Sequence, residues 1–183
     1  MKVADYKRAM PSAAVLAWYN AVPNLLWSAL AFAPLVVFCY QYLPRLCLYG
    51  FGAVSLLPYA WPVTWLQRLQ LSSNVAAYRR LRVPALNQFT QNGALINRLV
   101  RQRYPNYCYQ PTRAALLKLH RTTYQQERFH WAALIFFLLA SGYALAQGRV
   151  GWAAGLTGLN VGYNLYPIWL QQYLRLRLRR LNR

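Results

Sequence analysis

Long stretches without a charged residue are the feature of this sequence that most limits how it can fold. No Lys, Arg, Asp or Glu occurs in four runs, which cover residues 10–44, 46–67, 129–148 and 150–174. Each run is about 20 residues or more, the length that an α-helix needs to cross roughly 30 Å of hydrocarbon. Helices also close their backbone hydrogen bonds internally, as lipid requires. We therefore predict an all-α, polytopic integral membrane protein.

The four runs predict four transmembrane helices in a single membrane domain that comprises the whole chain. We expect these helices over approximately residues 20–43, 47–66, 129–147 and 151–172. Pro11, Pro23 and Pro34 interrupt the first run, so part of it is expected to lie along the membrane interface. A secretory signal peptide is the competing interpretation of residues 1–33, because Ala31-Phe32-Ala33 resembles a cleavage site.

The charges are almost all positive, and their distribution predicts the orientation. The chain has 21 Lys and Arg residues against two acids. The basic residues precede the first run, fill the central loop 67–128 and follow the last run, whereas each remaining connection holds one, Arg45 or Arg149. Because positive loops stay in the cytoplasm, we expect both termini and the central loop there, with the chain in the bacterial inner membrane.

The central loop has the pattern of short amphipathic helices that lie in the membrane surface. Its apolar residues recur at helical spacing, and arginines fill the opposite positions. The apolar positions are Val75, Tyr78, Leu81, Leu95, Ile96, Leu99 and Val100. A third helix is expected to begin near Pro111-Thr112 and to continue into the predicted span at 129–147. The basic face is attracted to anionic lipid headgroups or, alternatively, binds a phosphate-bearing or acidic carrier. No nucleic-acid partner is expected, because no separate fold presents these helices.

One pair of side chains in the sequence suggests chemistry. Glu127 and His130 are three residues apart at the cytoplasmic end of the third span, a spacing that puts both on one helix face. A carboxylate beside an imidazole fixes its tautomer and raises its basicity, so His130 is a candidate general base with Glu127 as its orienting partner. The alternative is a structural His at the interface, with Glu127 neutralised by Arg128 or Arg121.

The fourth span contains a second polar feature. Asn160 and Asn164 share one helix face, and polar residues within a span tend to face the bundle interior. Their two interpretations are interhelical contacts and a substrate site that faces Glu127 and His130. Cys39 and Cys47 flank the first outer turn, where they are able to pair, and no spacing typical of a metal site occurs.

Three stretches of the chain carry motifs that occur together in one family. The first is Glu127-Arg-Phe-His130-Trp131, which is similar to a Glu-x-x-His-Trp motif at the start of a hydrophobic segment. The second runs from Asn164 through Pro167-Ile to Arg175-Leu-Arg177-Leu, and the third is Tyr78-Arg-Arg-Leu81 followed by Asn92-Gly93. The set resembles the glycosyl-4,4'-diaponeurosporenoate acyltransferase family of staphyloxanthin-type carotenoid synthesis over roughly residues 75–180.

The resemblance implies transfer of a fatty acyl group from an acyl thioester to a sugar hydroxyl of a lipid-soluble glycoside. The donor would be acyl-CoA or acyl carrier protein, which are both anionic, and no bound cofactor is expected. We expect His130 and Glu127 to act in catalysis, and five residues to bind substrate: Asn164, Asn160, Arg128, Arg175 and Arg177. Two other classes stay open, a non-catalytic membrane subunit and a small lipid-binding or transport protein.

The predicted orientation is testable with reporter fusions. Fusions at Gly93 and at Arg183 are expected to report the cytoplasm, and a fusion at Arg149 the opposite side, because an even number of spans separates the basic segments. Paired cytoplasmic and external reporters at each position provide the measurement. A cytoplasmic signal at Arg149 contradicts the topology.

Overall fold

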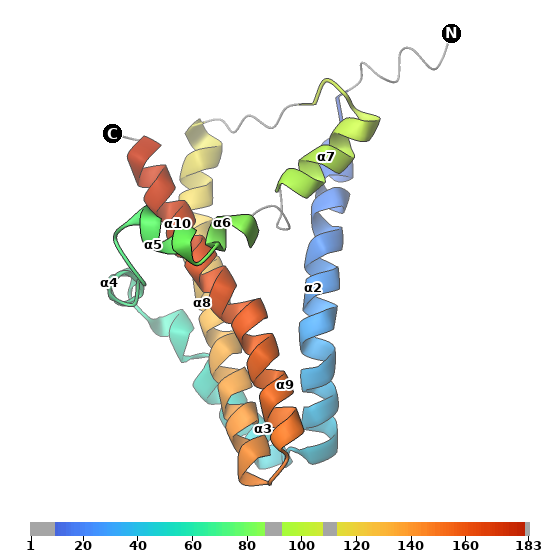
Figure 1. The fold of residues 1–183 in the computed structure, drawn as a ribbon, viewed down its shortest axis with the longest axis vertical. Coiled ribbons are helices and arrows are strands. Elements are labelled where there is room, and N and C mark those ends of the chain that lie inside the picture. The colour runs from blue at the N-terminus through green and yellow to red at the C-terminus, as the bar shows by residue number, and fades with distance from the viewer. Residues whose placement is uncertain (1–9, 87–92, 108–112, 182–183) are drawn as a thin grey trace.

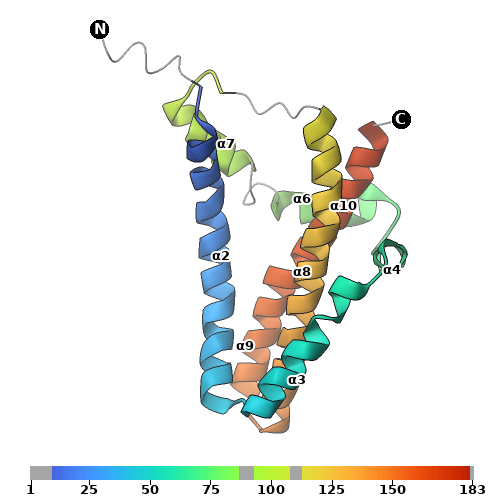
Figure 2. The same ribbon diagram turned by 180° about the vertical axis from the view of Figure 1, so that it is seen from behind.

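The computed structural model describes residues 10–86, 93–107 and 113–181, and within these residues the chain forms helices and no strand. Its longest elements are α2 (Ala13–Tyr42), α8 (Arg113–Ala146) and a helical rod of three parts. The rod consists of α9 (Val150–Asn160), a π-helical segment (Val161–Leu165) and α10 (Tyr166–Leu181). Figures 1 and 2 show α8 and the rod side by side, with α2 against the end at which α8 connects to α9.

Helix α2 is continuous, so the expected break near its prolines is wrong. Ser12 caps its start by accepting a hydrogen bond from the Val15 amide at 3.3 Å. Pro23 and Pro34 each remove one N–H donor, but the helix continues through both positions. It ends at Tyr42, two residues before Pro44. The interpretation of an interfacial segment followed by a span over 20–43 therefore gives way to one helix that starts seven residues earlier.

The second predicted span, 47–66, is not one helix. The chain there forms α3 (Arg45–Ser55), a 3₁₀ turn (Leu57–Ala60) and α4 (Val63–Arg68). Pro58 and Pro62 cannot donate the backbone hydrogen bonds that would continue α3, and the Ser55 hydroxyl donates to the Gly52 carbonyl at 2.7 Å at its end. An uncharged run indicates the length and polarity of a segment but not whether one helix continues through it. The prediction of a continuous helix was therefore wrong here.

Helix α8 and the rod form an antiparallel hairpin. The predicted span 129–147 coincides with the second half of α8 except for its last residue, and the predicted span 151–172 lies inside the rod. Gly148 has a φ of +69° and connects them. The Gly148 amide donates to the Leu145 carbonyl and the Arg149 amide to the Ala144 carbonyl, both at 2.9 Å. These two bonds form a Schellman motif, which favours glycine at the left-handed position. The helix expected to enter the third span from the loop is confirmed as the first part of α8.

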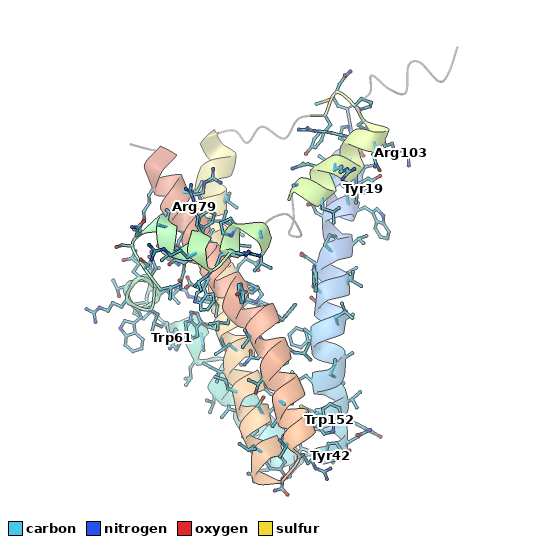
Figure 3. The ribbon with its side chains drawn as sticks, viewed as in Figure 1. Tyr19, Tyr42, Trp61, Arg79, Arg103 and Trp152 are labelled. Atoms are coloured by element: carbon cyan, nitrogen blue, oxygen red, sulfur yellow. The ribbon has the colours of Figure 1, made fainter. Side chains whose placement is uncertain are left out.

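The hydrophobic core lies where α2 joins the hairpin. Phe38, Phe137 and Leu156, from α2, α8 and α9, are almost completely buried in one cluster. Next to this cluster the Tyr42 and Trp152 rings lie 6.0 Å apart (Figure 3), and the Arg149 guanidinium carbon lies 3.7 Å from the Tyr42 ring centre. Cys39 and Cys47 are both free thiols, so they form no disulfide.

Short helices of the central loop lie across the other end of the bundle. They are α5 (Val75–Arg80), α6 (Val83–Leu86) and α7 (Ala94–Arg103). Helices at these positions were predicted, but their apolar faces pack on protein. Val75, Tyr78 and Val83 pack with Leu170 and Tyr173 of α10. Ile96 and Val100 of α7 pack near Tyr19 of α2 instead, at the place marked by Tyr19 and Arg103 in Figure 3.

By length and composition, two helices in the described part of the chain can cross a membrane. They are α2 and the segment Leu119–Ala146 of α8. The connections α2–α3 and α8–α9 lie together at one end of the molecule, and α5, α6, α7 and the start of α2 lie toward the other (Figure 1). The basic segments are thus gathered at one end, and the single arginines Arg45 and Arg149 are near the opposite end.

Candidate active site

The polar side chains of α8 lie on the face that contacts the rod. Thr123, Glu127 and Phe137 on this face are completely buried, and His130 between them is partly buried. The facing side of the rod is buried over a similar length at Asn160, Asn164, Ile168, Gln172 and Arg175. Because the two helices run antiparallel, residues late in the rod meet residues early on this face of α8. Two polar clusters result.

The first cluster is centred on the Glu127 carboxylate. Its Oε2 is 2.5 Å from Nη2 of Arg175, and the two side chains are 0% and 3% exposed. Its Oε1 accepts a hydrogen bond from Nε2 of Gln172 at 2.8 Å. The Arg175 guanidinium also stacks on Tyr124, with 4.2 Å between its central carbon and the ring centre. A buried charge requires such partners, because an unpaired carboxylate out of water is strongly unfavourable.

Gln172 connects this cluster to the loop before α5. Its Oε1 accepts hydrogen bonds from the Leu71 amide and from the Tyr78 hydroxyl, both at 3.1 Å. Burial raises the pKa of Tyr78, so its hydroxyl stays protonated and remains a donor. The Tyr78 hydroxyl also accepts from the Ser72 amide at 3.2 Å. The Glu127 cluster therefore holds α8, α10 and the segment around residues 69–78 together.

The second cluster holds His130. Its Nδ1 lies 3.4 Å from Oδ1 of Asn164, and Nδ2 of Asn164 donates to Oδ1 of Asn160 at 2.8 Å. Nδ2 of Asn160 in turn donates to the Leu134 backbone carbonyl at 3.1 Å. A carbonyl only accepts, so this last bond fixes the orientation of both amides and presents an acceptor oxygen to His130. The arrangement favours the imidazole with its proton on Nδ1 and a free lone pair on Nε2.

A π-helical segment positions Asn164 and the neighbouring backbone. The Tyr166 amide donates to the Val161 carbonyl, five residues back, which widens the helix at this point. Pro167 has no N–H for the Tyr163 carbonyl, four residues before it, and this missing donor explains why the α-helical ladder is interrupted. Single π-helical turns within α-helices are frequent at functional sites.

The structure brings together some of the predicted site residues but in a different grouping. In the described part of the chain no hydrogen bond or ion pair joins Glu127 to His130. Glu127 pairs with Arg175 and Gln172, and His130 pairs with Asn164. Asn164 contacts His130, whereas Asn160 contacts Asn164 and the Leu134 carbonyl of α8, which is an interhelical contact. The alternative in which an arginine neutralises Glu127 is also found, although that arginine is Arg175 rather than Arg128 or Arg121.

The three arginines expected to bind substrate have different environments. Arg175 is 2% exposed, so it does not lie on the surface. Arg128 is partly buried, and its Nη2 donates to the Trp61 carbonyl at 2.8 Å. Arg177 is exposed, and its guanidinium carbon lies 5.9 Å from the Tyr173 ring centre. Of the three, Arg177 is the most available to solvent.

Gln172 and Tyr163 were not among the residues predicted from the sequence. The spacing does contain a signal for Gln172, because Asn160, Asn164, Ile168 and Gln172 follow one another at intervals of four and so share a helix face. Tyr163 has no such signal. Within the described residues, no group of three or more His, Cys, Asp or Glu side chains is placed to bind a metal ion.

A comparison with protein families gives one match. The model of the family described as glycosyl-4,4'-diaponeurosporenoate acyltransferase matches residues 62–183, which include both polar clusters. The chain belongs to this family. The family is named for an acyltransferase that acts on a carotenoid glycoside, so the chain is an enzyme of the transferase class. No curated protein and no solved structure matches the chain.

The first cluster predicts a stability effect that depends on charge pairing. Glu127→Gln and Arg175→Gln should each destabilise the folded protein by ~3–5 kcal/mol, because each leaves one buried charge without its partner. The double variant should lose less than the sum of the two single losses, because it removes both charges. Thermal unfolding in a mild detergent measures all three.

Arg179→Gln is the matched control, since Arg179 is exposed and lies four residues after Arg175 on the same helix. The midpoint of thermal unfolding of this variant should stay close to that of the parent protein. Additive losses in the double variant, or single variants as stable as the parent, would show that the ion pair does not hold the helices together.

Proposed function

We propose that the chain transfers a fatty acyl group from an acyl thioester to a sugar hydroxyl of a lipid-soluble, carotenoid-type glycoside at the membrane surface. The family match supports the acyltransferase class and the glycoside acceptor. The observation that carries the mechanism is the contact between His130 and Asn164, because it leaves the Nε2 lone pair of the imidazole available as a base. The donor is acyl-CoA or acyl carrier protein.

The proposed reaction needs one base. Nε2 of His130 takes the proton of the sugar hydroxyl while the hydroxyl oxygen forms a bond to the thioester carbonyl carbon. The carbon–sulfur bond then breaks, and the imidazolium returns the proton to the leaving thiolate. The products are the acyl ester and the free thiol, and the enzyme returns to its starting state. Asn164 keeps the proton on Nδ1 at the start of the cycle and stabilises the imidazolium as its hydrogen-bond acceptor.

This chemistry suits a membrane protein. The acceptor and the acyl chain both partition into lipid, and α2 and α8 are long and apolar enough to span it. We propose that the chain crosses the bacterial inner membrane several times with both termini in the cytoplasm. In this arrangement the broken segment formed by α3, the 3₁₀ turn and α4 lies alongside α8. Membrane lipids surround the exposed apolar side chains of α2.

We propose that the thioester donor binds at the basic end of the molecule. Exposed arginines gather there on several elements, among them Arg79, Arg80, Arg82, Arg177 and Arg179. A fork of guanidinium donors suits the phosphates of coenzyme A and the acidic surface of a carrier protein. The structure separates these groups from Arg175, whose charge is used inside the protein by Glu127.

His130→Ala tests the proposed base. A general base contributes ~10²–10⁴ in rate, so kcat should fall by about that factor. Asn164→Leu keeps the imidazole but removes the acceptor that holds its proton on Nδ1, so it should lower kcat with little change in either KM. Release of free thiol and formation of the acyl ester, measured with purified protein in lipid vesicles, give both constants.

Ser141→Ala is the control for these variants. Ser141 is a buried polar residue of α8, and it lies about 16 Å along the helix from His130 at a rise of about 1.5 Å per residue. Its activity should match that of the parent. If a well-folded His130→Ala protein acylates at the parent rate, the imidazole is not the base.

Arg177→Gln together with Arg179→Gln tests the donor surface. The KM for the thioester should rise and the KM for the glycoside should not, because the substitutions remove positive charge where the anionic donor binds. Added salt should raise the donor KM of the parent more than that of the variant, because salt screens exposed charges. Arg45→Gln, at the opposite end, is the control. A donor KM in the parent that is independent of salt excludes charge attraction.

A further inference from the structure

Helix α2 carries a row of polar side chains within an apolar sequence. Asn20, Asn24 and Ser28 follow one another at intervals of four and so share one face, whereas no charged residue occurs anywhere between Ala13 and Tyr42. Uncharged polar residues inside an apolar helix are costly in lipid and mark contacts or sites. The helix lies outside residues 62–183, the part that the family model matches. The row is therefore a feature of this chain that the family match does not explain.

Ser28 connects α2 to the catalytic cluster. Its hydroxyl lies 2.8 Å from the Tyr163 hydroxyl, a hydrogen-bonding distance in which either oxygen can be the donor. The Tyr163 ring meets the His130 ring edge to face, with 5.8 Å between their centres. Only one aromatic side chain therefore separates Ser28 from the proposed base. Phe32, one turn further along α2, packs edge-on against the same tyrosine at 5.4 Å.

Beyond Ser28, toward its N-terminus, α2 separates from α9 and α10. Its buried residues, Ala31, Leu35 and Phe38, all follow Ser28 in the sequence. Figures 1 and 2 both show α2 diverging from the hairpin in the direction of α7. Asn24 lies one turn before Ser28 on the same face and is exposed. Its amide thus faces the region between the diverging helices, one turn from the contact with Tyr163.

We propose that Asn24, Ser28 and Tyr163 form the subsite for the sugar of the acceptor glycoside, which deepens the proposed function and rests on it. Amide and hydroxyl groups both donate and accept hydrogen bonds, as sugar hydroxyls do. Because α2 has no charged residue, it does not suit the anionic part of the thioester donor, which we place at the basic end of the molecule. A sugar held here presents a hydroxyl to Nε2 of His130, and its apolar tail lies against the exposed Leu26 and Leu30 in the lipid.

Kinetic constants for each substrate test this subsite. Asn24→Leu, Ser28→Ala and Tyr163→Phe should each raise the KM for the glycoside by roughly three- to tenfold, as expected for the loss of one hydrogen bond. The KM for the thioester should not change. Ser28→Ala combined with Tyr163→Phe should exceed neither single effect by much, because the two hydroxyls share one contact.

A positional swap provides the matched control. Asn24→Leu with Leu25→Asn keeps composition and hydropathy but moves the amide to a neighbouring position on a different face of α2, where the side chain of residue 25 is 65% exposed. The swapped protein should behave like Asn24→Leu. If its glycoside KM equals that of the parent, the direction of the amide is irrelevant and the subsite is wrong. A change confined to the thioester KM also overturns it.

Photocrosslinking separates this inference from the proposed function, because it needs no turnover. A long-chain alkyl glucoside with a diazirine on the sugar, added to the protein in vesicles, should label peptides of α2 around Asn24 and of the π-helical segment. Labelling should fall several-fold in Asn24→Leu. Label spread evenly over the lipid-facing helices contradicts the subsite. Specific label together with no acyl ester from the parent would instead contradict the proposed reaction.

Discussion

The buried ion pair between Glu127 and Arg175 is the interaction on which the arrangement of the site depends. Glu127 is one of two acids in a chain with 21 basic residues, and its side chain is completely buried. Its second oxygen accepts from Gln172, which in turn accepts from Leu71 and Tyr78. A pair like this contributes less to net stability than to specificity, because desolvation offsets most of the attraction. Here it fixes the register of α8 against α10, and this register brings His130 opposite Asn164.

The π-helical segment then sets the environment of His130 itself. Pro167 removes one backbone donor, and Asn164 presents an oxygen whose orientation is fixed through Asn160 by a backbone carbonyl. The consequence is an imidazole held by a neutral amide acceptor rather than by a carboxylate. Glu127 therefore has a positioning role, and His130 is the candidate base. Helix α2 contacts the same region through the hydrogen bond between Ser28 and Tyr163.

The sequence predicted where the long helices lie and which residues share a face, but not the full length of the helices or the partners across the interface. Uncharged runs located α2, the second half of α8 and most of the rod, since helix length and apolar composition are both properties of a continuous stretch of sequence. They failed at 47–66, where Pro58 and Pro62 break a segment of suitable composition. Spacing put Glu127 and His130 on one face, but their partners lie 45 and 34 positions away, and only the packing of two helices determines that register.

We propose that this chain joins an acyl group to the sugar of a membrane-soluble glycoside. The decisive measurement uses the purified protein in vesicles that contain a carotenoid glycoside, to which an acyl thioester is added, and mass spectrometry of the extracted lipids. The expected product is a glycoside heavier by one acyl group, formed in equal amount to the free thiol. Free thiol accompanied by free fatty acid, or an unchanged glycoside, would contradict it.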